Sequence, residues 1–558
     1  MNTDTTRKSC LSPFFKKFLA SGDLFVWGSG AGLAIALLMV IGLLLLIIVN
    51  GMGFFWTGDI VELTLTDGNR VMGQLAGRET IPNSITPDSP EGKDRIRVKI
   101  GNRDLYGLDF KWVDEDKIAS RTFPPTAVLL ERREWGNMYA WIKAIHRGET
   151  LYAEGSDVGW NALLPLVDQA NDLHAQIDRI ERVEIGKINA EIEQGRLQIR
   201  ALEMRTRPGQ TSDGPTRYRL QTAIAAAEAQ YRTKTDALEL LYARFNAYSV
   251  VMVDANGREK QLPVGQIIRA LRPNEMGLLA KTWIYVTNVW RVLVDEPREA
   301  NTEGGIFPAI FGTVMLVLIM SMAVVPFGVL AALYLREYAK QGTIVRLVRI
   351  AVNNLAGVPS IVFGVFGLGF FVYAIGGTID TLFFSEALPS PTYGTGGILW
   401  ASLTLALLTV PVVIVATEEG LAAVPRDFRE GSLALGATKL ETVIRVLLPC
   451  AMPAILTGLI LAMARAAGEV APLMLTGVVK LAPTLPLDAT WPFFHFDRKF
   501  MHLGFHIYDV GFQSPNVEAA KPMVYITTLV LIIVVVLLNL TAITLRNHLR
   551  KKYAGSAV

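Results

Sequence analysis

Two ionisable residues stand inside an apolar segment of the chain. Arg465 and Glu469 lie four residues apart in the run ARAAGE, within a stretch from 451 to 477. We expect both side chains on one helix face, because residues four apart are neighbours on a helix surface. A guanidinium binds an oxyanion through two parallel hydrogen bonds, and ionisable groups at membrane depth commonly line a pathway. The pair therefore predicts a path for an oxyanion.

The same pair leaves alternatives open. Glu469 would hold Arg465 in place, or accept a proton from the anion. Its charged form would also repel a dianion and so discriminate among anions. In the structural alternative the pair only fixes packing. Three hydroxyl residues on neighbouring predicted spans would add neutral donors, namely Ser360, Thr404 and Thr409. Their alternative is helix–helix packing, which is a common role of serine and threonine in membranes.

A charged segment, EGSLALGATKLETVIRVLLP from 430 to 449, directly precedes this stretch. Its first part predicts a short surface helix, after which Gly436 permits a tight turn and the close approach of another chain. Thr438 predicts the cap of a second helix, with Glu441 completing a capping box. Pro449 is expected to end that second helix, so that the next span starts at an angle. The pattern predicts two short helices at the mouth of a span.

The composition indicates the elements that must position these residues. The chain has 558 residues, of which 51% are hydrophobic, and its mean hydropathy is +0.34, which predicts several membrane spans. A helix crosses the bilayer with ~20 apolar residues. Six stretches qualify, near 26–50, 308–335, 355–376, 396–416, 451–477 and 522–545. The first is too long for a signal peptide and is expected to be a retained anchor.

Lys and Arg predict the orientation. They gather in a leader over 1–25, between the second and third spans, between the fourth and fifth, and in a tail over 546–558, whereas 377–395 has none. All four basic segments fall on one side of six spans, which the positive-inside rule makes the cytoplasm. Both termini are expected to be cytoplasmic, and a large insert over 57–305 is expected on the opposite, periplasmic side.

The sequence of the insert predicts three structural parts. A β unit over 57–120 begins with a hairpin, because alternating apolar residues flank the turn Asp67-Gly68. Heptad-like spacing over 160–246 predicts an antiparallel coiled-coil hairpin, whose helices of some forty residues would reach about 60 Å from the membrane. A β and interface segment follows over 248–305. The insert would be a rigid spacer or assembly surface, or it would dock a soluble partner or act as a sensor.

Several classes of function are excluded. The net charge of +3 lacks the basic excess of nucleic-acid binders. The chain contains no phosphate-binding loop of the ATPase type and no nucleophile arrangement, so neither catalysis nor a cofactor is expected. His502 and His506 are four residues apart with His495 nearby, but no acidic or cysteine residue is placed as a third metal ligand. An amphipathic segment at the membrane surface is preferred for them.

The segment from 430 to 449 resembles the EAA loop of ABC-importer permeases, with Gly431-Ser432 where the family usually has two alanines. The runs LAGVPSIVFGVFGL, SLTLALLTVPVVIVATEEGLAAVP and ARAAGEVAPLMLTG resemble the PstA type, a membrane subunit of phosphate importers. Val470 stands where threonine is usual. The resemblance covers about 300–558.

The resemblance implies an α-helical polytopic membrane protein, with a six-helix permease fold, its transport core over 306–545, in a bacterial inner membrane. It implies a second permease of the PstC type, an ATPase dimer of the PstB type and a periplasmic phosphate-binding protein of the PstS type. Phosphate would pass near Arg465. The ATPase would couple through a set of loop residues, namely Arg429, Glu430, Gly436, Ala437, Leu448 and Pro449.

Two rival hypotheses remain at the level of the sequence. The first is a permease for another oxyanion, such as molybdate or sulfate, which the general loop also fits. The second belongs to another class: a membrane-anchored coiled-coil scaffold or a phosphate-signalling component, whose spans only hold the insert. Competition between anions would separate the first rival, and dispensability of the loop would favour the second.

Overall fold

The computed structural model describes residues 23–81, 93–205, 214–488, 490–514 and 517–554. Most of the predicted leader, residues 206–213 of the predicted helical hairpin and the last four residues of the tail lie outside the described residues.

In the described part of the chain, six helices are long and apolar enough to cross a membrane, which confirms the predicted number of spans. Three spans are single helices, namely α2 (Asp23–Gly53), α12 (Ile398–Ala423) and α18 (Val517–Ala554). The second span joins α8 (Phe307–Leu333) to η6 (Tyr334–Tyr338), and the third joins α10 (Ser360–Phe366), η7 (Gly367–Gly376) and α11 (Gly377–Phe383). The fifth joins α14 (Lys439–Thr442), η9 (Val443–Leu447) and α15 (Leu448–Gly468).

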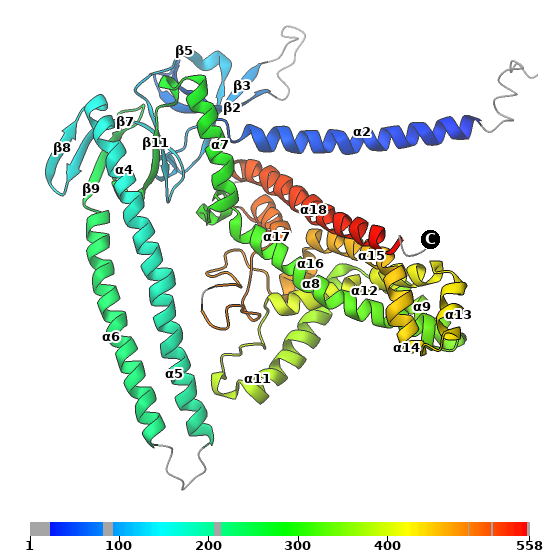
Figure 1. Ribbon diagram of the computed structural model, residues 1–558. Coiled ribbons are helices and arrows are strands. Elements are labelled where there is room, and N and C mark those ends of the chain that lie inside the picture. The colour runs from blue at the N-terminus through cyan, green and yellow to red at the C-terminus, as the bar shows by residue number, and fades with distance from the viewer. Residues whose placement is uncertain (1–22, 82–92, 206–213, 489, 515–516, 555–558) are drawn as a thin grey trace, which may run out of the picture.

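The spans have two distinct ends. We call the end that meets the insert the insert end, and the opposite end the far end. Helix α9 (Thr343–Leu355), helix α13 (Arg426–Ala434) and the C-terminal part of α18 gather at the far end (Figure 1). Short elements cover the insert end, namely η8 (Ser385–Ala387), α16 (Ala471–Thr476), α17 (Leu503–Tyr508) and η10 (Asp509–Gln513).

Helix α12 forms the centre of the bundle and packs against both α8 and α15. Its fully buried Leu405 belongs to one core with Met320 of α8 and Ala462 of α15. Small residues let α12 and α15 approach closely: a Cβ at Gly458 would lie 2.6 Å from the Cβ of Ala416. Close contact through small residues is how membrane helices associate, since lipid tails are as apolar as leucine.

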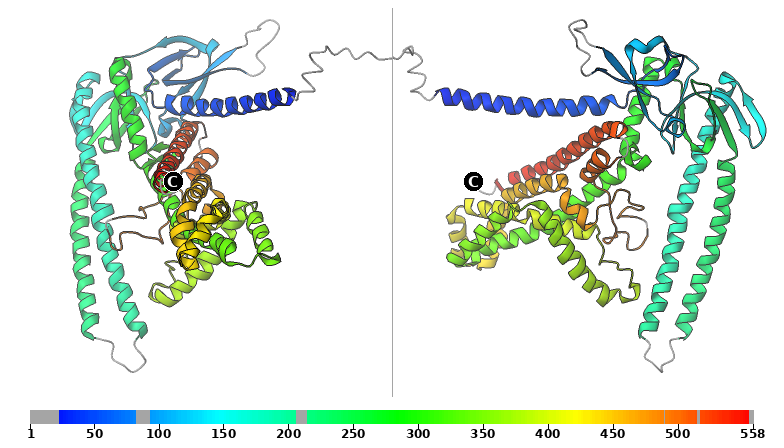
Figure 2. Two further views of the ribbon diagram at one scale, coloured as in Figure 1. Left: turned by 45° about the vertical axis from the view of Figure 1, so that its right-hand side comes forward. Right: turned by 180° about the vertical axis from the view of Figure 1, so that it is seen from behind.

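Helix α2 stands apart from this bundle. Its side chains from Phe25 to Leu46 are exposed, and its main helix neighbour is α18, where Gly51 lies against the backbone of Tyr525. Figures 1 and 2 show the two helices diverging from that contact toward the far end.

The insert begins with an antiparallel sheet in the order β4-β3-β2-β1-β5. Its strands are β1 (Ile60–Leu65), β2 (Arg70–Thr80), β3 (Asp94–Lys99), β4 (Phe110–Asp114) and β5 (Ile118–Thr122), with the short helix α3 (Arg103–Tyr106) between β3 and β4. The predicted hairpin is present, since Thr64 pairs with Arg70 and Gly68 takes φ +83 in the turn.

A second sheet has the order β10-β9-β7-β6-β11, with β8 on β7. Its strands are β6 (Val128–Arg132), β7 (Met138–Arg147), β8 (Thr150–Glu154), β9 (Tyr248–Val253), β10 (Glu259–Pro263) and β11 (Ile267–Leu271). Helix α4 (Ser156–Asp178) packs its fully buried Leu163 on this sheet. Helix α7 (Leu278–Val294), β12 (Pro297–Arg298), η5 (Glu299–Asn301) and β13 (Glu303–Gly304) lead into α8.

A helical hairpin leaves the second sheet between β8 and β9. Helix α4 continues through η2 (Arg179–Ile185) into α5 (Gly186–Arg205), and α6 (Gly214–Phe245) returns beside it. Ile188 and Ile192 of α5 pack with Ala227 of α6. Supercoiling of the pair stays a prediction.

The predicted reach of this hairpin away from the membrane is wrong. In Figures 1 and 2 the hairpin runs crosswise to α2 and lies over the insert end of the bundle. Helix α5 contacts η8 there, and this tertiary contact holds the hairpin sideways.

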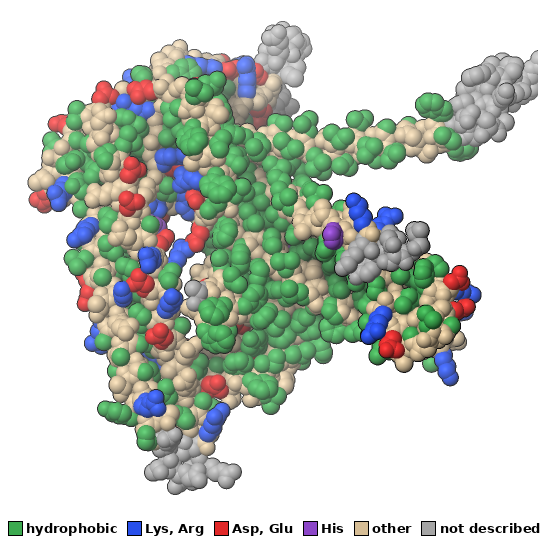
Figure 3. Space-filling view, in the orientation of Figure 1, with side chains coloured by type: hydrophobic (Ala, Val, Ile, Leu, Met, Phe, Trp, Pro, Cys, Tyr) green, Lys and Arg blue, Asp and Glu red, His purple; other side chains and the backbone are tan. Residues whose placement is uncertain are grey.

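Figure 3 separates the surface into zones. Hydrophobic side chains cover α2 and the visible side of the bundle, whereas charged side chains gather over the insert, over the hairpin and at the far end. This apolar band between two charged zones is the distribution expected of a chain that crosses a bilayer.

Candidate functional site

Arg465 lies in the last turn of α15, and the helix ends three residues later at Gly468. Glu469 takes an extended backbone conformation, with φ −79 and ψ 135, before α16 begins. Pro472 explains the break, because its ring would clash with the carbonyl of residue 468 in a continuous helix. The predicted unbroken span from 451 to 477, with both residues on one helix face, is therefore wrong.

The two side chains nevertheless meet, with 3.5 Å between Nε of Arg465 and Oε1 of Glu469. They are 34% and 21% exposed. Within the described part of the chain, the Arg465 side chain makes no polar contact besides this ion pair. Its Nη groups are therefore available to donate hydrogen bonds to another acceptor. The carbonyl end of α15 adds a favourable field, since cations are stabilised at helix C-termini.

The two threonines use their hydroxyls within their own helix. Thr404 donates to the carbonyl of Trp400 over 2.7 Å, and Thr409 donates to the carbonyl of Leu405 over 2.8 Å. Both side chains are fully buried. The expectation of free donors on the path is corrected for these two residues, which serve packing in this conformation.

Ser360 is better placed near the helix break. It is the first residue of α10, follows Pro359 and is partly buried. One turn later, Gly364 lies so close to α16 that a Cβ there would be 2.7 Å from the Cα of Pro472. Ser360 therefore remains a candidate for the path beside Arg465 and Glu469.

The segment 426–447, which we call the far-end segment, turns at Gly436 as predicted. Gly436 takes φ +87, its N–H donates to the carbonyl of Leu433, and the N–H of Ala437 donates to the carbonyl of Ser432. This pair of bonds is a Schellman motif, which favours glycine at the left-handed position. The predicted capping box is also present, with Thr438 and Glu441 bonded reciprocally.

Pro449 does not end the helix, and this prediction is wrong. The chain passes from α14 through the π-helical segment η9 directly into α15, with Pro449 in the first turn of α15. In η9 the N–H of Leu448 donates to the carbonyl of Val443. This wider turn accommodates the proline, so one continuous helix runs from Lys439 to Gly468.

Glu337, which sequence reasoning missed, anchors the far-end segment to the end of α8. Its carboxylate lies 2.6 Å from the Arg429 guanidinium and is 5% exposed. Lys439 donates to the backbone carbonyl of Glu337. Glu418, near the end of α12, pairs with Arg349 of α9 over 3.2 Å. An acidic residue at the end of an apolar span is the signal that could have identified Glu337.

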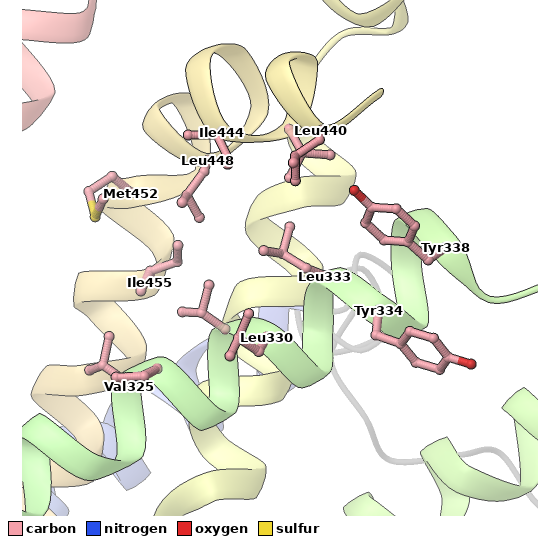
Figure 4. Close-up of a pocket in the computed structure, with 13 residues that line it drawn as sticks. Val325, Leu330, Leu333, Tyr334, Tyr338, Leu440, Ile444, Leu448, Met452 and Ile455 are labelled. Atoms are coloured by element: carbon pink, nitrogen blue, oxygen red, sulfur yellow. The ribbon is translucent and has the colours of Figure 1, made fainter. Parts of the chain in front are cut away.

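An apolar groove of about 650 Å³ separates the far-end segment from α8. Leu448, a residue of the predicted coupling set, lines it with Leu440 and Ile444 on one side and Leu330 and Leu333 on the other (Figure 4). The side chains of Leu330 and Leu333 point toward those of Leu448 and Ile455 across it. An apolar contact of this kind has no hydrogen bonds to break when one helix shifts.

The tip of the far-end segment is free of the rest of the chain. Leu435 is 90% exposed, Glu430 is exposed, and a Cβ at Gly436 would meet nothing within 4 Å. A large exposed apolar side chain beside an open glycine turn suits a partner surface.

The two histidines do not lie on the surface, which corrects the preferred amphipathic interpretation. His502 and His506 are buried, and no group of three metal-binding side chains occurs among the described residues. Burial lowers the pKa of His502 to about 3 and that of His506 to about 4. Nδ1 of His502 accepts from the N–H of Gly504, a structural role.

Comparison with known proteins adds the family. Residues 324–555 match the model of the binding-protein-dependent transport system inner membrane component. The phosphate transport system permease protein PstA 1 of Mycobacterium tuberculosis is 34% identical over 272 residues, which are 48% of this chain and 80% of the relative. The probable ABC transporter permease protein YqgI of Bacillus subtilis is 33% identical over 45% of this chain and 81% of the relative.

The phosphate transport system permease protein PstA of Haemophilus influenzae is 32% identical over 36% of this chain and 68% of the relative. Among solved structures, an inward-facing MetNI methionine ABC transporter chain matches 49% of this chain and 99% of its own length, at 19% identity and a TM-score of 0.31. Given the matched family model and relatives covered over most of their length, the chain belongs to the PstA-type permeases of ABC transport systems.

Proposed function

We propose that this permease is the membrane-spanning subunit of an ATP-driven importer of inorganic phosphate. The observation that carries the proposal is the continuous helix from Lys439 to Gly468. One end of this helix carries the exposed turn at Gly436, and the other end carries Arg465. A movement imposed on the turn would displace the guanidinium directly. The relatives named as phosphate permeases support phosphate as the substrate.

The partners follow from this arrangement. An ATPase dimer of the PstB type would receive the far-end segment through Arg429, Glu430, Gly436, Ala437, Leu448 and Pro449. A second permease of the PstC type would complete the path, and a binding protein of the PstS type would deliver phosphate at the insert end. The far end would face the cytoplasm with both termini, and the insert the periplasm, in accord with the basic segments.

At the other end of the helix, phosphate would bind the free Nη donors of Arg465. Two parallel hydrogen bonds from a guanidinium match two phosphate oxygens. Glu469 would hold the guanidinium between transport events and repel a dianion that approaches without a proton. Ser360 would add a neutral donor near the helix break.

Closure of the ATPase would shift the far-end segment across its groove. The apolar lining around Leu448 adds no hydrogen bonds that α14 and α15 would have to break when they move against α8. The ties to Glu337 would then be the contacts that change between states. Such a rigid-body shift is a common form of alternating access.

Radiolabelled phosphate uptake tests the path, in cells that lack other phosphate importers and at matched membrane abundance. We expect Arg465→Gln to reduce uptake about tenfold or more, because a charged hydrogen bond is lost. The control Arg346→Gln removes an exposed charge on α9 and should leave uptake unchanged. Normal uptake in Arg465→Gln would contradict the path. Competition by sulfate or molybdate in the wild type would favour another oxyanion.

A pair of glycine variants tests the coupling. Gly436 and Gly257 both take positive φ, +87 and +80, with open space around the Cβ position. Gly436→Trp should abolish uptake while leaving membrane abundance intact, whereas Gly257→Trp in the insert should preserve it. Undiminished uptake in Gly436→Trp would make the far-end segment dispensable and favour a scaffold role.

A further inference from the structure

A second polar site lies where the insert meets the bundle, away from Arg465. A cavity of about 720 Å³ opens there between the end of α2, strands β2 and β3, helix α7, the β12–β13 hairpin and the start of α18. Both the first and the last span therefore contribute to its wall. Val49 of α2, Phe54 directly after α2 and Met523 of α18 supply apolar parts.

Charged side chains line the rest of this cavity. The basic ones are Arg97, Lys99, Arg291, Arg298 and Lys521, and the acidic ones are Glu131, Asp295, Glu303 and Glu518. Most of the acids are already engaged. Glu131 pairs with Arg269 and Arg291, Asp295 pairs with Arg291, and Glu518 lies 3.6 Å from Arg97.

Three basic side chains of the lining stand outside these ion pairs. Within the described part of the chain, Lys99, Arg298 and Lys521 form no ion pair, although all three line the cavity. Arg298 donates to the backbone carbonyl of Arg132 over a long 3.5 Å. Burial lowers the pKa of Arg298, and the nearby carboxylates Glu303 and Glu131 oppose this effect only in part. A partly buried guanidinium that forms no ion pair favours an anion.

Glu303 is the internal competitor for these cations. Glu303 lies opposite Arg298 in the β12–β13 hairpin. The positive charges of Lys99 and Arg298 both act to lower the pKa of its carboxyl group. Burial nevertheless raises the pKa of Glu303. Burial therefore penalises this carboxylate as a counter-ion, and an anion with several oxygens would add contacts to the three cations that one carboxylate does not provide.

We propose that this cavity binds a phosphate group through Arg298, Lys99 and Lys521, in addition to the transport path. A phosphate offers a bidentate edge to the guanidinium and further oxygens to the two ammonium groups. The group would come from free inorganic phosphate or from the headgroup of an anionic phospholipid. A lipid headgroup could enter from the bilayer, because the ends of two spans form part of the cavity wall. A phosphate ion could enter from solution, because the cavity also borders the insert.

Binding to the purified full chain in detergent tests this site. All samples carry Arg465→Gln, so that the proposed path does not contribute. The probes are inorganic phosphate, followed by calorimetry, and phosphatidylglycerol, followed by native mass spectrometry with phosphatidylcholine as the neutral reference. We expect the double variant Arg298→Gln, Lys521→Gln to weaken binding about tenfold or more. The matched control, Lys187→Gln with Arg219→Gln, removes two exposed charges from the hairpin and should change binding less than twofold.

The two probes distinguish the sources. Loss of phosphatidylglycerol binding alone identifies a lipid headgroup, loss of inorganic phosphate binding alone identifies a solute, and loss of both with mutual competition identifies one shared site. Equal binding by the double variant and its parent would overturn the proposal. So would a parent that binds neither probe above the phosphatidylcholine reference.

A variant that gains affinity separates the proposal from misfolding. Glu303→Gln keeps the shape of the side chain but removes the competing carboxylate. We expect it to bind the same probe several-fold more tightly, which a damaged fold does not produce. Unchanged or weaker binding in Glu303→Gln would contradict the proposed competition.

Discussion

The insert and the far-end segment flank the same bundle but are held in opposite ways. In the insert, the Arg132 guanidinium is 1% exposed and makes two hydrogen bonds to the carboxylate of Asp104, over 3.0 and 3.1 Å. In the far-end segment, the polar ties to α8 converge on Glu337, and Arg429 is 36% exposed. An apolar groove makes up much of the remaining contact.

This difference indicates which region is built to move. Regions with few buried polar contacts open at low free-energy cost, whereas buried and fully bonded networks open only with the domain around them. The insert is therefore expected to keep one geometry through a transport cycle, and the far-end segment is expected to change its position. The following variants would break or sharpen this contrast.

The largest effect is expected from the buried arginine of the insert. Arg132→Leu leaves the buried Asp104 with Lys260, 3.5 Å away, as its remaining cation, and should cost about 3 kcal/mol of unfolding free energy, the lower end for a broken buried pair. Arg70→Leu, which removes an arginine that is 57% exposed and lies 3.4 Å from Glu62, should cost less than about 1 kcal/mol. Pulse proteolysis of the full chain in urea measures both. Equal losses would remove the contrast between buried and exposed pairs.

The buried histidines predict a pH dependence at the insert end. The pKa of His506 is lowered to about 4 by burial, with Lys480 lowering it further and Asp509 opposing, against ~6.5 when unfolded. The unfolded state therefore binds the proton first, so stability is lost as pH falls below ~6.5. His506→Leu should reduce the loss between pH 7.5 and pH 5 by about 2 kcal/mol. His548→Gln, at an exposed position of α18, should not.

The ion pair at Glu337 should have a smaller effect, confined to the far-end segment. Arg429→Ala should raise hydrogen exchange of the amides over 426–447 about fivefold, which corresponds to about 1 kcal/mol. Arg445→Ala removes an exposed arginine and should leave exchange unchanged. If exchange in the insert rose instead, the far-end segment would not be an independent unit.

The smallest effect is expected at the helix cap. Thr438→Ala removes the hydroxyl that accepts from the N–H of Glu441, and N-cap losses cost about 0.5–2 kcal/mol, toward the lower value at an exposed site. Thr438→Ser retains the hydroxyl and should restore most of the protection against hydrogen exchange in α14. Identical exchange in the two variants would show that the cap contributes nothing measurable.

Local rules predicted part of this molecule well. The number of spans follows from hydropathy, and the turn at Gly436 and the cap at Thr438 follow from the backbone preferences of glycine and threonine. These features depend on a few adjacent residues. The site residues Arg465 and Glu469 were found because charge is rare in an apolar segment.

The errors have a common physical origin in competing or distant contacts. Pro449 was expected to end a helix, but the π turn of η9 accommodates its missing N–H, whereas Pro472 breaks the span that was expected to continue. Nothing in heptad spacing encodes the contact between α5 and η8 that turns the hairpin sideways. The hydroxyls of Thr404 and Thr409 were available to the backbone one turn earlier, which spacing alone does not reveal.

The isolation of α2 has a consequence for how the chain is made. Its main helix partner is α18, the last span, and synthesis runs from the N-terminus to the C-terminus. Helix α2 must therefore remain in the bilayer without that partner while the insert and four further spans are produced. Its mean hydropathy is 3.2, against 1.9 to 2.8 in the other spans, which favours its retention in lipid. The span that is least buried by protein is therefore the one that lipid alone retains best.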